Sequence, residues 1–310
     1  MNSADKRDRF IGALMGTFVG DALGMPYEGW GVGTGPIEMT SGVYTDDTQM
    51  MIGVAESLVA CGGFDGADMA RRFLENFDYM RGYGAGAFQV MDRLAAGRQW
   101  DQAGEGLFDS GSFGNGSAMR IAPIGVFYHD DDEKLREAAQ LSSIISHTHP
   151  LGKQGAMLQA YSVALALRYG MTGKLDAGEM IQKLRDFLPE NAHVFGDKLA
   201  SVEYLLSGDP PRREVARKLG NGIRSFESVP TAIYSFLSHP ESFEDAVIYA
   251  VGLGGDADTI GAMTGAIAGA YHGYQKIPSS WLDKLENGDK GRDYVLGLAS
   301  NLYDTWLKVK

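Results

Sequence analysis

The stretch that decides the fold of this chain reads Gly12-Ala13-Leu14-Met15-Gly16-Thr17-Phe18-Val19-Gly20-Asp21-Ala22-Leu23-Gly24. Glycine recurs here at every fourth position, although each glycine inside a helix costs about 1 kcal/mol relative to alanine. Residues four apart share one face of a helix, so these glycines form a flat ridge that lets a second helix axis approach closely. A second ridge of the same period lies late in the chain, at Gly261, Gly265, Gly269 and Gly273. We predict that the two helices pack near one another.

Most other segments also carry apolar residues at helical spacing, and convincing period-two strands are scarce. The clearest such segments are 65–80, 133–145, 154–169, 177–188 and 243–251. No long Pro, Ser or Gly linker divides the 310 residues, and the motifs described below pair the first fifty residues with the last sixty. We therefore expect an all-α, compact multi-helix bundle that forms a single domain over residues 1–310.

Composition excludes several classes of protein. Hydrophobic residues make up 44% of the chain and charged residues 22%, which is ordinary globular usage. Subtracting 40 acidic from 28 basic residues gives a net charge of −12, which would repel a nucleic-acid backbone. A single cysteine, Cys61, excludes an internal disulfide, and no run of about 18 apolar residues is present to span a membrane. We expect a cytoplasmic monomer that binds neither nucleic acid nor membranes.

Two acidic clusters stand next to apolar helical segments. Thr45-Asp46-Asp47-Thr48 precedes the segment 50–60, and Asp256-Ala257-Asp258-Thr259 opens the second glycine-ridged helix. Each cluster alone is typical of a helix N-cap, because its oxygens and charges suit the positive helix end. A cap uses one side chain, however, whereas each cluster offers two carboxylates and a hydroxyl. If the clusters meet, with Glu28 as a fifth carboxylate, they require protons or cations, and their hard oxygen ligands favour Mg²⁺, Mn²⁺ or Ca²⁺ over Zn²⁺.

A glycine-rich stretch, Gly111-Ser112-Phe113-Gly114-Asn115-Gly116-Ser117, makes a poor helix but can expose successive backbone amides. Such amides can bind a phosphate where a loop leads into a helix, and a plain turn is the alternative interpretation. The stretch 81–86 has the same two interpretations. Neither matches GxxxxGK[ST] or a strand-borne GxGxxG, which disfavours nucleotide hydrolysis and dinucleotide redox chemistry. His147 and His149 lack a third soft ligand, so we favour substrate contact or a surface role over metal binding.

Together these motifs resemble those of the ADP-ribosylglycohydrolases. The similarity rests on Gly20-Asp21-Ala22-Leu23-Gly24 with Glu28, on the cluster 45–48, and on Gly254-Gly255-Asp256-Ala257-Asp258-Thr259-Ile260-Gly261. It spans nearly the whole chain. More narrowly, the chain resembles the branch that hydrolyses ADP-ribosylserine. This similarity rests on 81–84, on 111–116, and on Gly220-Asn221-Gly222-Ile223 with Phe226-Glu227-Ser228-Val229-Pro230-Thr231-Ala232.

The resemblance implies an all-helical domain that holds two Mg²⁺ per chain, or Mn²⁺, and hydrolyses a glycosidic or ester bond at the anomeric carbon of ribose. Its implied substrates are ADP-ribosylserine, poly(ADP-ribose) and O-acetyl-ADP-ribose. The implied metal ligands are Thr45, Asp46, Asp47, Asp256, Asp258 and Thr259, and the implied catalytic carboxylates are Glu28, Asp46 and Asp47. The ADP-ribose of a modified protein would be held by Gly84, Gly111, Ser112, Phe113, Gly114, Asn115, Gly116, His147 and Ile223.

The implied chemistry also has a physical basis in the residues. Cleavage at an anomeric carbon passes through a state with positive charge on the sugar, which a carboxylate such as Glu28 can stabilise while activating water. Backbone amides can bind a diphosphate without lysines, which suits an acidic protein. Two alternatives remain open at this point: an arginine-specific ADP-ribosyl hydrolase, and a non-catalytic ADP-ribose-binding protein. The 226–232 motif argues against the arginine-specific hydrolase. The complete set of implied metal ligands argues against the non-catalytic binding protein.

Overall fold

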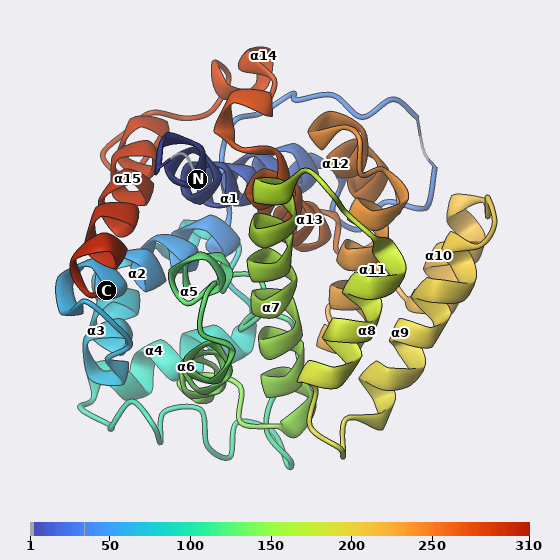
Figure 1. Cartoon of the computed structure of the whole chain (residues 1–310). Helices are drawn as coiled ribbons and strands as arrows, with labels where there is room; N and C mark the ends of the chain where they lie inside the picture. Colours follow the sequence, from blue (N-terminus) through green and yellow to red (C-terminus); the bar gives the residue numbers. More distant parts are fainter. Residues whose placement is uncertain (1–2, 34) are drawn as a thin grey trace.

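The structure is a computed structural model that describes residues 3–33 and 35–310. Within these residues all regular secondary structure is helical, apart from one isolated backbone bridge between Gly114 and Arg224. Figure 1 shows the helices gathered into one bundle, in which α7 runs through the middle of the view. The prediction of an all-α fold is therefore confirmed.

The order of the helices follows the chain. The first part of the chain contains α1 (Ser3–Gly24), α2 (Asp46–Cys61), α3 (Gly66–Asn76), α4 (Ala85–Ala95), α5 (Ala122–Phe127), α6 (Asp132–Ile144) and α7 (Pro150–Thr172). The rest contains α8 (Ala177–Phe187), α9 (His193–Leu206), α10 (Arg212–Leu219), α11 (Ser225–Ser238), α12 (Phe243–Val251), α13 (Ala257–His272), α14 (Ser279–Leu282) and α15 (Arg292–Lys308). Single 3₁₀ turns lie at Met25–Tyr27, Tyr79–Arg81 and Tyr274–Lys276.

The predicted helical segments match these helices, with differences at their ends. The predicted segment 65–80 contains α3, which ends at Asn76, because Phe77 and Asp78 adopt non-helical backbone. The side chain of Asp78 instead caps the short turn that follows, by accepting a hydrogen bond from the amide of Met80. The predicted segment 154–169 is part of the longer α7, and within this segment every residue except Arg168 is buried.

The glycine ridges of α1 and α13 face each other at backbone distance. A Cβ atom built on Gly16 would lie 2.1 Å from the carbonyl oxygen of Gly265, and one built on Gly265 would lie 2.0 Å from the carbonyl oxygen of Gly16. No side chain fits into such a space, so the two helix axes approach as closely as glycine permits. The predicted packing of the two ridges is confirmed.

The register of the ridges determines which ends of the helices meet. Gly12 lies against Gly269, Gly20 lies against Gly261, and Gly24 lies against the carbonyl of Ala257. The two helices are therefore antiparallel, and the C-terminal end of α1 lies beside the N-terminal end of α13. Both acidic clusters and Glu28 adjoin these two ends, so backbone packing brings together segments more than two hundred residues apart.

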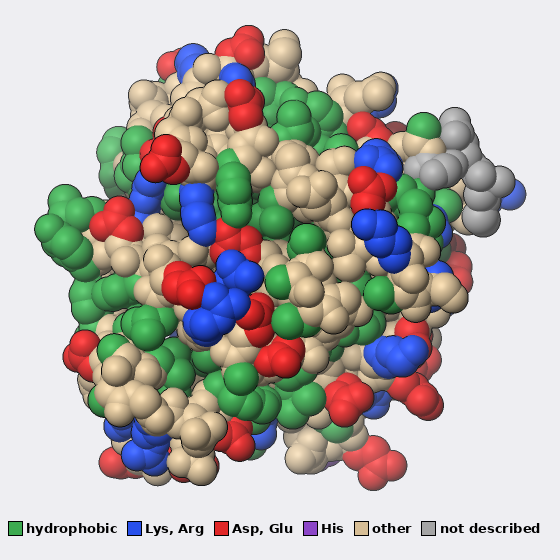
Figure 2. Space-filling view, turned by 90° about the vertical axis from the view of Figure 1, so that its left-hand side faces the viewer, with side chains coloured by type: hydrophobic (Ala, Val, Ile, Leu, Met, Phe, Trp, Pro, Cys, Tyr) green, Lys and Arg blue, Asp and Glu red, His purple; other side chains and the backbone are tan. Residues whose placement is uncertain are grey.

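The surface of the bundle carries charges of both signs. Figure 2 views the molecule from the side of α15, α2 and α3 in Figure 1, and its Lys and Arg side chains lie beside Asp and Glu. Arg71 of α3, for example, pairs with Asp68 and Glu75, and Lys290 pairs with Glu56. In the described part of the chain, no helix combines the length and the apolar character that crossing a bilayer requires.

We predict that Gly16→Ala destabilises the fold by about 3 kcal/mol, the upper end of the usual cost of overpacking. The added methyl group would collide with backbone of α13 rather than with a side chain that can move. Urea unfolding measures the change. Gly297→Ala in α15 is the control, because a Cβ there meets no atom within 4 Å and should leave stability unchanged or raise it by up to about 1 kcal/mol. A Gly16→Ala protein as stable as the wild type would contradict the packing argument.

Candidate active site

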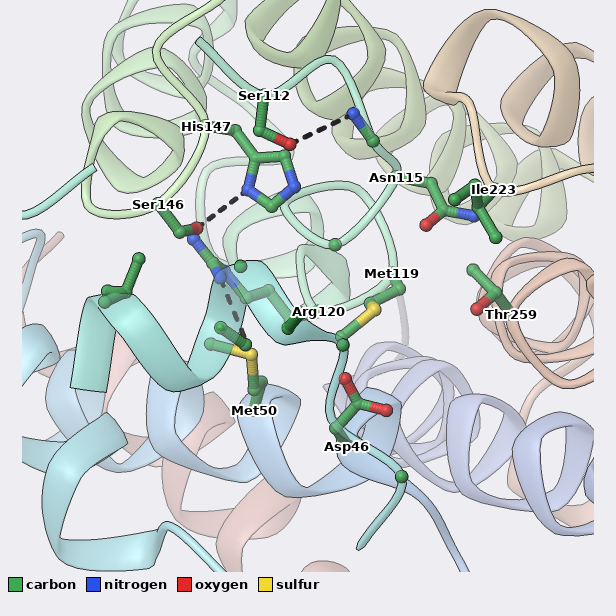
Figure 3. Close-up of a pocket in the computed structure, with 18 of the residues that line it drawn as sticks. Asp46, Met50, Ser112, Asn115, Met119, Arg120, Ser146, His147, Ile223 and Thr259 are labelled. Carbon is green, nitrogen blue, oxygen red and sulfur yellow. Dashed lines mark hydrogen bonds between the residues drawn. The ribbon is translucent and has the colours of Figure 1, made fainter. Parts of the chain in front are cut away.

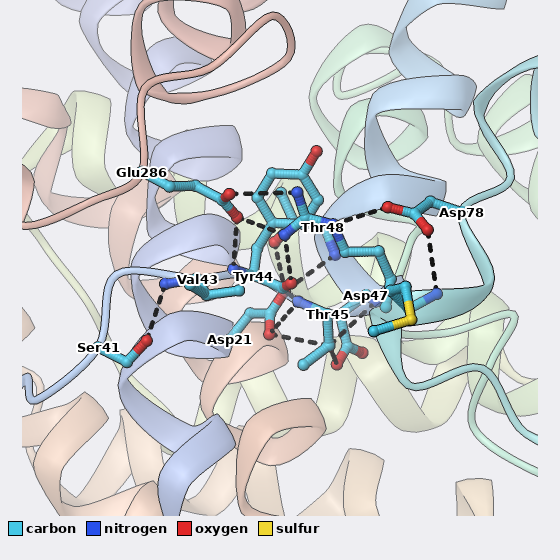
Figure 4. A network of polar contacts seen from close by, with 11 residues as sticks. Asp21, Ser41, Val43, Tyr44, Thr45, Asp47, Thr48, Asp78 and Glu286 are labelled. Atoms are coloured by element: carbon cyan, nitrogen blue, oxygen red, sulfur yellow. Dashed lines mark hydrogen bonds and ion pairs between the residues drawn. The ribbon is translucent and has the colours of Figure 1, made fainter.

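One buried carboxylate of α1 fixes the first acidic cluster. Asp21 is fully buried and accepts hydrogen bonds from the backbone amides of Thr45 (3.0 Å) and Thr48 (3.1 Å) and from both of their hydroxyls. Figure 4 shows Asp21 beside Thr45. Burial raises the pKa of Asp21 to about 6, against the lowering effect of these donors. Asp21 is not among the site residues predicted from the sequence, since its position in a motif does not indicate which groups it binds.

The cluster 45–48 forms the first turn of α2. The predicted helical segment 50–60 begins later and places the cluster before the helix. Thr45 is the N-cap, and its hydroxyl accepts a hydrogen bond from the amide of Asp47 (3.4 Å). Asp256 occupies the N-cap position of α13, yet its side chain makes no capping hydrogen bond. Capping therefore accounts for Thr45 but leaves the carboxylates of Asp46, Asp47 and Asp256 for another purpose.

The two clusters meet in space, which the metal site predicted from the sequence requires. The hydroxyl of Thr259 donates to Asp47 Oδ2 across 3.4 Å, which joins the start of α13 to the start of α2. Next to this contact, Glu28, Asp256 and Asp258 each place a carboxylate oxygen within 4.8 Å of the other two. Asp256 and Asp258 are buried, whereas Glu28 is exposed.

Glycines at 254 and 255 bring the segment that carries Glu28 against the start of α13. The amide of Gly29 donates to the carbonyl of Gly255 (2.7 Å), and the amide of Gly255 donates to the carbonyl of Trp30 (3.0 Å). Gly254 and Gly255 both have left-handed φ values, +65° and +69°. A Cβ on Gly255 would lie 2.1 Å from the carbonyl oxygen of Asn221, so glycine is required there on both grounds.

The carboxylates of the cluster bind protons more tightly than ordinary carboxylates do. Burial raises the pKa of Asp46 to about 7, with the charge of Asp21 adding to the effect. Burial raises the pKa of Asp258 to about 9, with the charge of Asp256 contributing next. The pKa of Asp256 rises to about 6 and that of Asp47 lies well above its ordinary value, again mainly through burial. Holding these groups ionised together therefore requires a compensating positive charge.

The donor set fits a hard divalent cation. All of its side chains offer oxygen, and Oδ1 of Asp47 is buried without any hydrogen-bond partner. A buried carboxylate oxygen with no donor is costly, and a bound cation would relieve that cost. The geometry thus allows a metal ion or ions to be held among Thr45, Asp46, Asp47, Asp256, Asp258, Thr259 and Glu28.

The acidic cluster forms one end of a cavity of about 380 Å³, a volume typical of small-molecule sites. Figure 3 shows part of its wall, where Asp46 and Thr259 lie across from Ser112 and His147. Among the residues predicted to bind substrate, those that line the cavity are Gly84, Ser112, Gly114, Asn115, Gly116, His147 and Ile223.

Three predicted site residues lie outside the cavity wall. Gly111 faces the other way, since a Cβ on it would lie 2.3 Å from Oγ1 of Thr148. Phe113 is 38% exposed and packs edge-on against His149, with ring centroids 5.4 Å apart. Asp47 lies behind the wall, where it contacts the hydroxyls of Thr45 and Thr259.

The two histidines of the sequence pair have different surroundings. His149 caps α7, because its Nδ1 accepts a hydrogen bond from the amide of Leu151 (3.1 Å). His147 lines the cavity and contacts the hydroxyl of Ser146 through Nδ1 (2.8 Å). Burial lowers the pKa of His147 to about 3, with the charge of Arg120 contributing, so its imidazole is neutral near pH 7.

The glycine-rich loop is attached to the loop before α11. The amide of Asn115 donates to the carbonyl of Ile223 (2.9 Å), and the amide of Ser225 donates to the carbonyl of Phe113 (3.0 Å). The amide of Asn115 is therefore already engaged, and the expected series of free successive amides is interrupted there. The side-chain amide of Asn115 donates to Asp256 and to Oγ of Ser228, which links the loop to the acidic cluster.

Arg120 is a cavity residue that is not among the site residues predicted from the sequence. Its guanidinium is fully buried, donates to the carbonyl of Ser142 (2.9 Å) and lies 4.6 Å from the centre of the Phe73 ring. Burial lowers the pKa of Arg120 to about 9, and its Nε has no hydrogen-bond partner. Its position after the glycine-rich loop gave no signal of this burial, because arginine is usually exposed.

The fold is the one expected of the enzyme family that the sequence resembles. The sequence profile described as ADP-ribosylglycohydrolase matches residues 2–309, and the chain belongs to this family of hydrolases acting on glycosyl bonds. It is 36% identical to the ADP-ribosylhydrolase ARH3 of Homo sapiens, in an alignment that covers 92% of this chain and 91% of that protein.

Two further relatives extend the comparison. A solved structure titled ADP-ribosylglycohydrolase-related protein complex superposes with a TM-score of 0.77 at 29% identity, covering 97% of this chain and 99% of the other. The ADP-ribosylarginine hydrolase Tri1 of Serratia proteamaculans is 25% identical, over 97% of this chain and 80% of that protein. The expected family membership and hydrolase class are thus confirmed.

We predict that the metal-free protein becomes less stable as the pH rises. The folded-state pKa values of Asp21, Asp46, Asp256 and Asp258 lie between about 6 and 9, above the ordinary 3.8. The folded state therefore binds protons more tightly, and the stability gained is fully present below about pH 4 and is lost as the pH passes through these values. Thermal unfolding in EDTA should show a falling Tm between about pH 5 and pH 9.

Added Mg²⁺ should raise the Tm more at the alkaline end of this range than at the acidic end, because the ionised carboxylates bind the ion. Asp258→Asn is the matched variant, and it should flatten the pH dependence in EDTA. A Tm in EDTA that rises across the range would contradict this account of the cluster.

Proposed function

We propose that this chain is a Mg²⁺-dependent hydrolase that releases ADP-ribose from modified proteins, with serine-linked ADP-ribose as the preferred substrate. The observation that carries the proposal is the meeting of Glu28, Asp256 and Asp258 at one end of a cavity whose wall includes the glycine-rich loop. Poly(ADP-ribose) and O-acetyl-ADP-ribose are further proposed substrates. We also propose that residues 1–310 act as one domain and as a monomer.

The proposed metal-holding residues are Thr45, Asp46, Asp47, Asp256, Asp258 and Thr259, for two Mg²⁺ or Mn²⁺ ions. When bound, the ions would fix the ribose hydroxyls and align the anomeric carbon for attack by water. The orphaned Oδ1 of Asp47 and the raised pKa values of its neighbours support this assignment.

Glu28 is the proposed carboxylate that activates water, with Asp46 and Asp47 as further catalytic candidates. It differs from its neighbours in being exposed, so its carboxylate is accessible to water while still lining the cavity. A base at this position can take the proton from the attacking water, and its negative charge can stabilise positive charge on the sugar. The backbone bonds between Gly29, Trp30 and Gly255 hold its segment beside Asp256.

The ADP part of the substrate is proposed to lie along Ser112, Gly114, Gly116, His147 and Ile223. The neutral imidazole of His147 can donate or accept a hydrogen bond without adding charge. Support for the serine linkage comes from the 226–232 motif. The motif begins in the first turn of α11, where the centre of the Phe226 ring lies 6.2 Å from that of Phe113. The loop before α11 is bound to the glycine-rich loop through the amide of Asn115.

Release of free ADP-ribose from a serine-modified peptide and from an arginine-modified protein tests the proposal. We expect release from the serine-linked substrate with Mg²⁺ and none with EDTA. Asp258→Ala should abolish release, because the remaining carboxylates would no longer enclose the ion. Faster release from the arginine-modified protein would establish the arginine-specific alternative, which the similarity to Tri1 favours. Binding of ADP-ribose without release from either substrate would establish a non-catalytic binding protein.

We predict that Glu28→Gln lowers turnover by a factor of about 10² to 10⁴, the usual contribution of a general base. Because the amide keeps the size of the carboxylate and removes only its charge, the Kd for ADP-ribose should stay within about threefold of wild type. Single-turnover kinetics and titration calorimetry measure the two quantities. Glu38→Gln, at an exposed position farther along the same segment, is the control and should change neither. Lost binding with retained turnover would reverse the role given to Glu28.

A further inference from the structure

Tyr44, the residue directly before the proposed metal-holding cluster 45–48, has both of its backbone polar groups bound by side chains from distant segments. Its amide donates to Oε1 of Glu286 across 2.9 Å, and its carbonyl accepts from Nη1 of Arg81 across 2.9 Å. Figure 4 shows Glu286 above this segment and Asp21 below it. Because hydrogen bonds to charged side chains are roughly twice as strong as neutral ones, this arrangement holds the entry to α2 in one position.

The two side chains that bind Tyr44 also bind each other. The guanidinium of Arg81 pairs with both carboxylate oxygens of Glu286, one of them at 3.1 Å, in a bidentate arrangement. The same guanidinium lies 3.8 Å from the centre of the Tyr44 ring, and this ring packs edge-on against Phe18 of α1. Arg81, Glu286 and Tyr44 therefore form a closed set of contacts, which we call the Tyr44 clamp.

The Tyr44 clamp joins three parts of the chain. Arg81 begins the loop whose Gly82 and Gly84 line the cavity. Glu286 also donates its backbone amide to the carbonyl of Gly42 (2.9 Å), which supports the segment leading to Tyr44. The clamp thus connects the C-terminal part of the chain and a cavity loop to the residue that precedes Thr45.

A second cavity of about 210 Å³ borders the clamp, but both basic side chains that line it are already paired. Arg81 is paired with Glu286, and Lys290 is paired with Glu56. The arrangement therefore favours a structural effect on the neighbouring loop over a separate ligand site.

We propose that Arg81 and Glu286 are positioning residues that set the metal affinity of the site through the backbone of Tyr44, an inference that rests on the proposed function. The cluster 45–48 carries carboxylates that repel one another, so its ligands keep a fixed arrangement only if the backbone is held. Asp21 holds it at Thr45 and Thr48, and the Tyr44 clamp holds it one residue earlier. The clamp pair is neutral overall, so its effect comes from geometry and not from an added charge.

Mn²⁺ binding to the full chain without substrate, measured by the EPR signal of free Mn²⁺, tests this proposal. We expect Glu286→Ala and Arg81→Met each to raise the Kd for Mn²⁺ by about 10- to 100-fold, the usual effect of losing groups that orient metal ligands. Glu286→Gln should stay within about threefold of wild type, because its carbonyl oxygen can still accept from the amide of Tyr44. The double variant should bind no more weakly than the weaker single variant, since both changes break one set of contacts.

Lys290→Gln is the matched control, because it removes a neighbouring ion pair that does not contact Tyr44. It should leave the Kd for Mn²⁺ unchanged, and circular dichroism should show that every variant is folded. Saturating Mn²⁺ should restore the release of ADP-ribose by Arg81→Met, which separates weaker metal binding from a direct role in the reaction.

Wild-type Mn²⁺ affinity in folded Glu286→Ala and Arg81→Met proteins would overturn the proposal. An equal loss of affinity in Glu286→Ala and Glu286→Gln, or in Lys290→Gln, would also overturn it, because charge or general stability would then be the cause. A wild-type protein that binds no Mn²⁺ overturns it as well. If the wild-type protein binds Mn²⁺ with an affinity that depends on the clamp as expected, but releases no ADP-ribose, the proposed function alone is overturned.

Discussion

The backbone contact between α1 and α13 is the constraint on which the rest of the structure depends. Each contact along it pairs a glycine with a carbonyl of the opposite helix, so neither helix can slide without forcing a Cβ or a bulkier group into backbone. A register shift of one turn would separate Asp21 and Glu28 from the start of α13. The position of the candidate active site is therefore set by steric contacts of the backbone, which do not depend on pH, ions or substrate.

This rigidity matters because the site itself opposes folding. Buried carboxylates at one place repel one another and lose hydration, as their raised pKa values show. The protein surrounds them with neutral or paired donors, including the threonine hydroxyls at 45 and 259 and the amide of Asn115. Arg120 is the exception, since it is a buried cation that no carboxylate within 4.0 Å pairs with in the described part of the chain. A site arranged in this way keeps its negative charge available for a cation instead of neutralising it with lysine or arginine.

Much of this arrangement could be predicted from the sequence because it follows from short-range patterns. The four-residue period of Gly12 to Gly24 predicted the helix pairing, and two acidic clusters that each exceeded the needs of a cap predicted a shared site. Properties set by tertiary packing could not be predicted in the same way. The burial of Arg120, the outward position of Phe113 and the donors gathered by Asp21 all depend on which segments pack around them, and no local pattern encodes that.

In the proposed function, the contrast in exposure between Glu28 and the other carboxylates corresponds to a division of roles. Asp47 and Asp258 sit in the first turns of rigid helices, where backbone packing and hydrogen bonds determine their positions. Glu28 lies outside any helix, and the two backbone hydrogen bonds between 29–30 and 255 hold its segment while leaving its side chain exposed. A group that must exchange protons with water benefits from this exposure, whereas groups that hold an ion benefit from burial and fixed geometry. The sequence separates Glu28 from the helix-borne carboxylates by placing it after the end of α1. There it is close to the acidic cluster, whose position the glycine ridges determine, but it is not part of a helix.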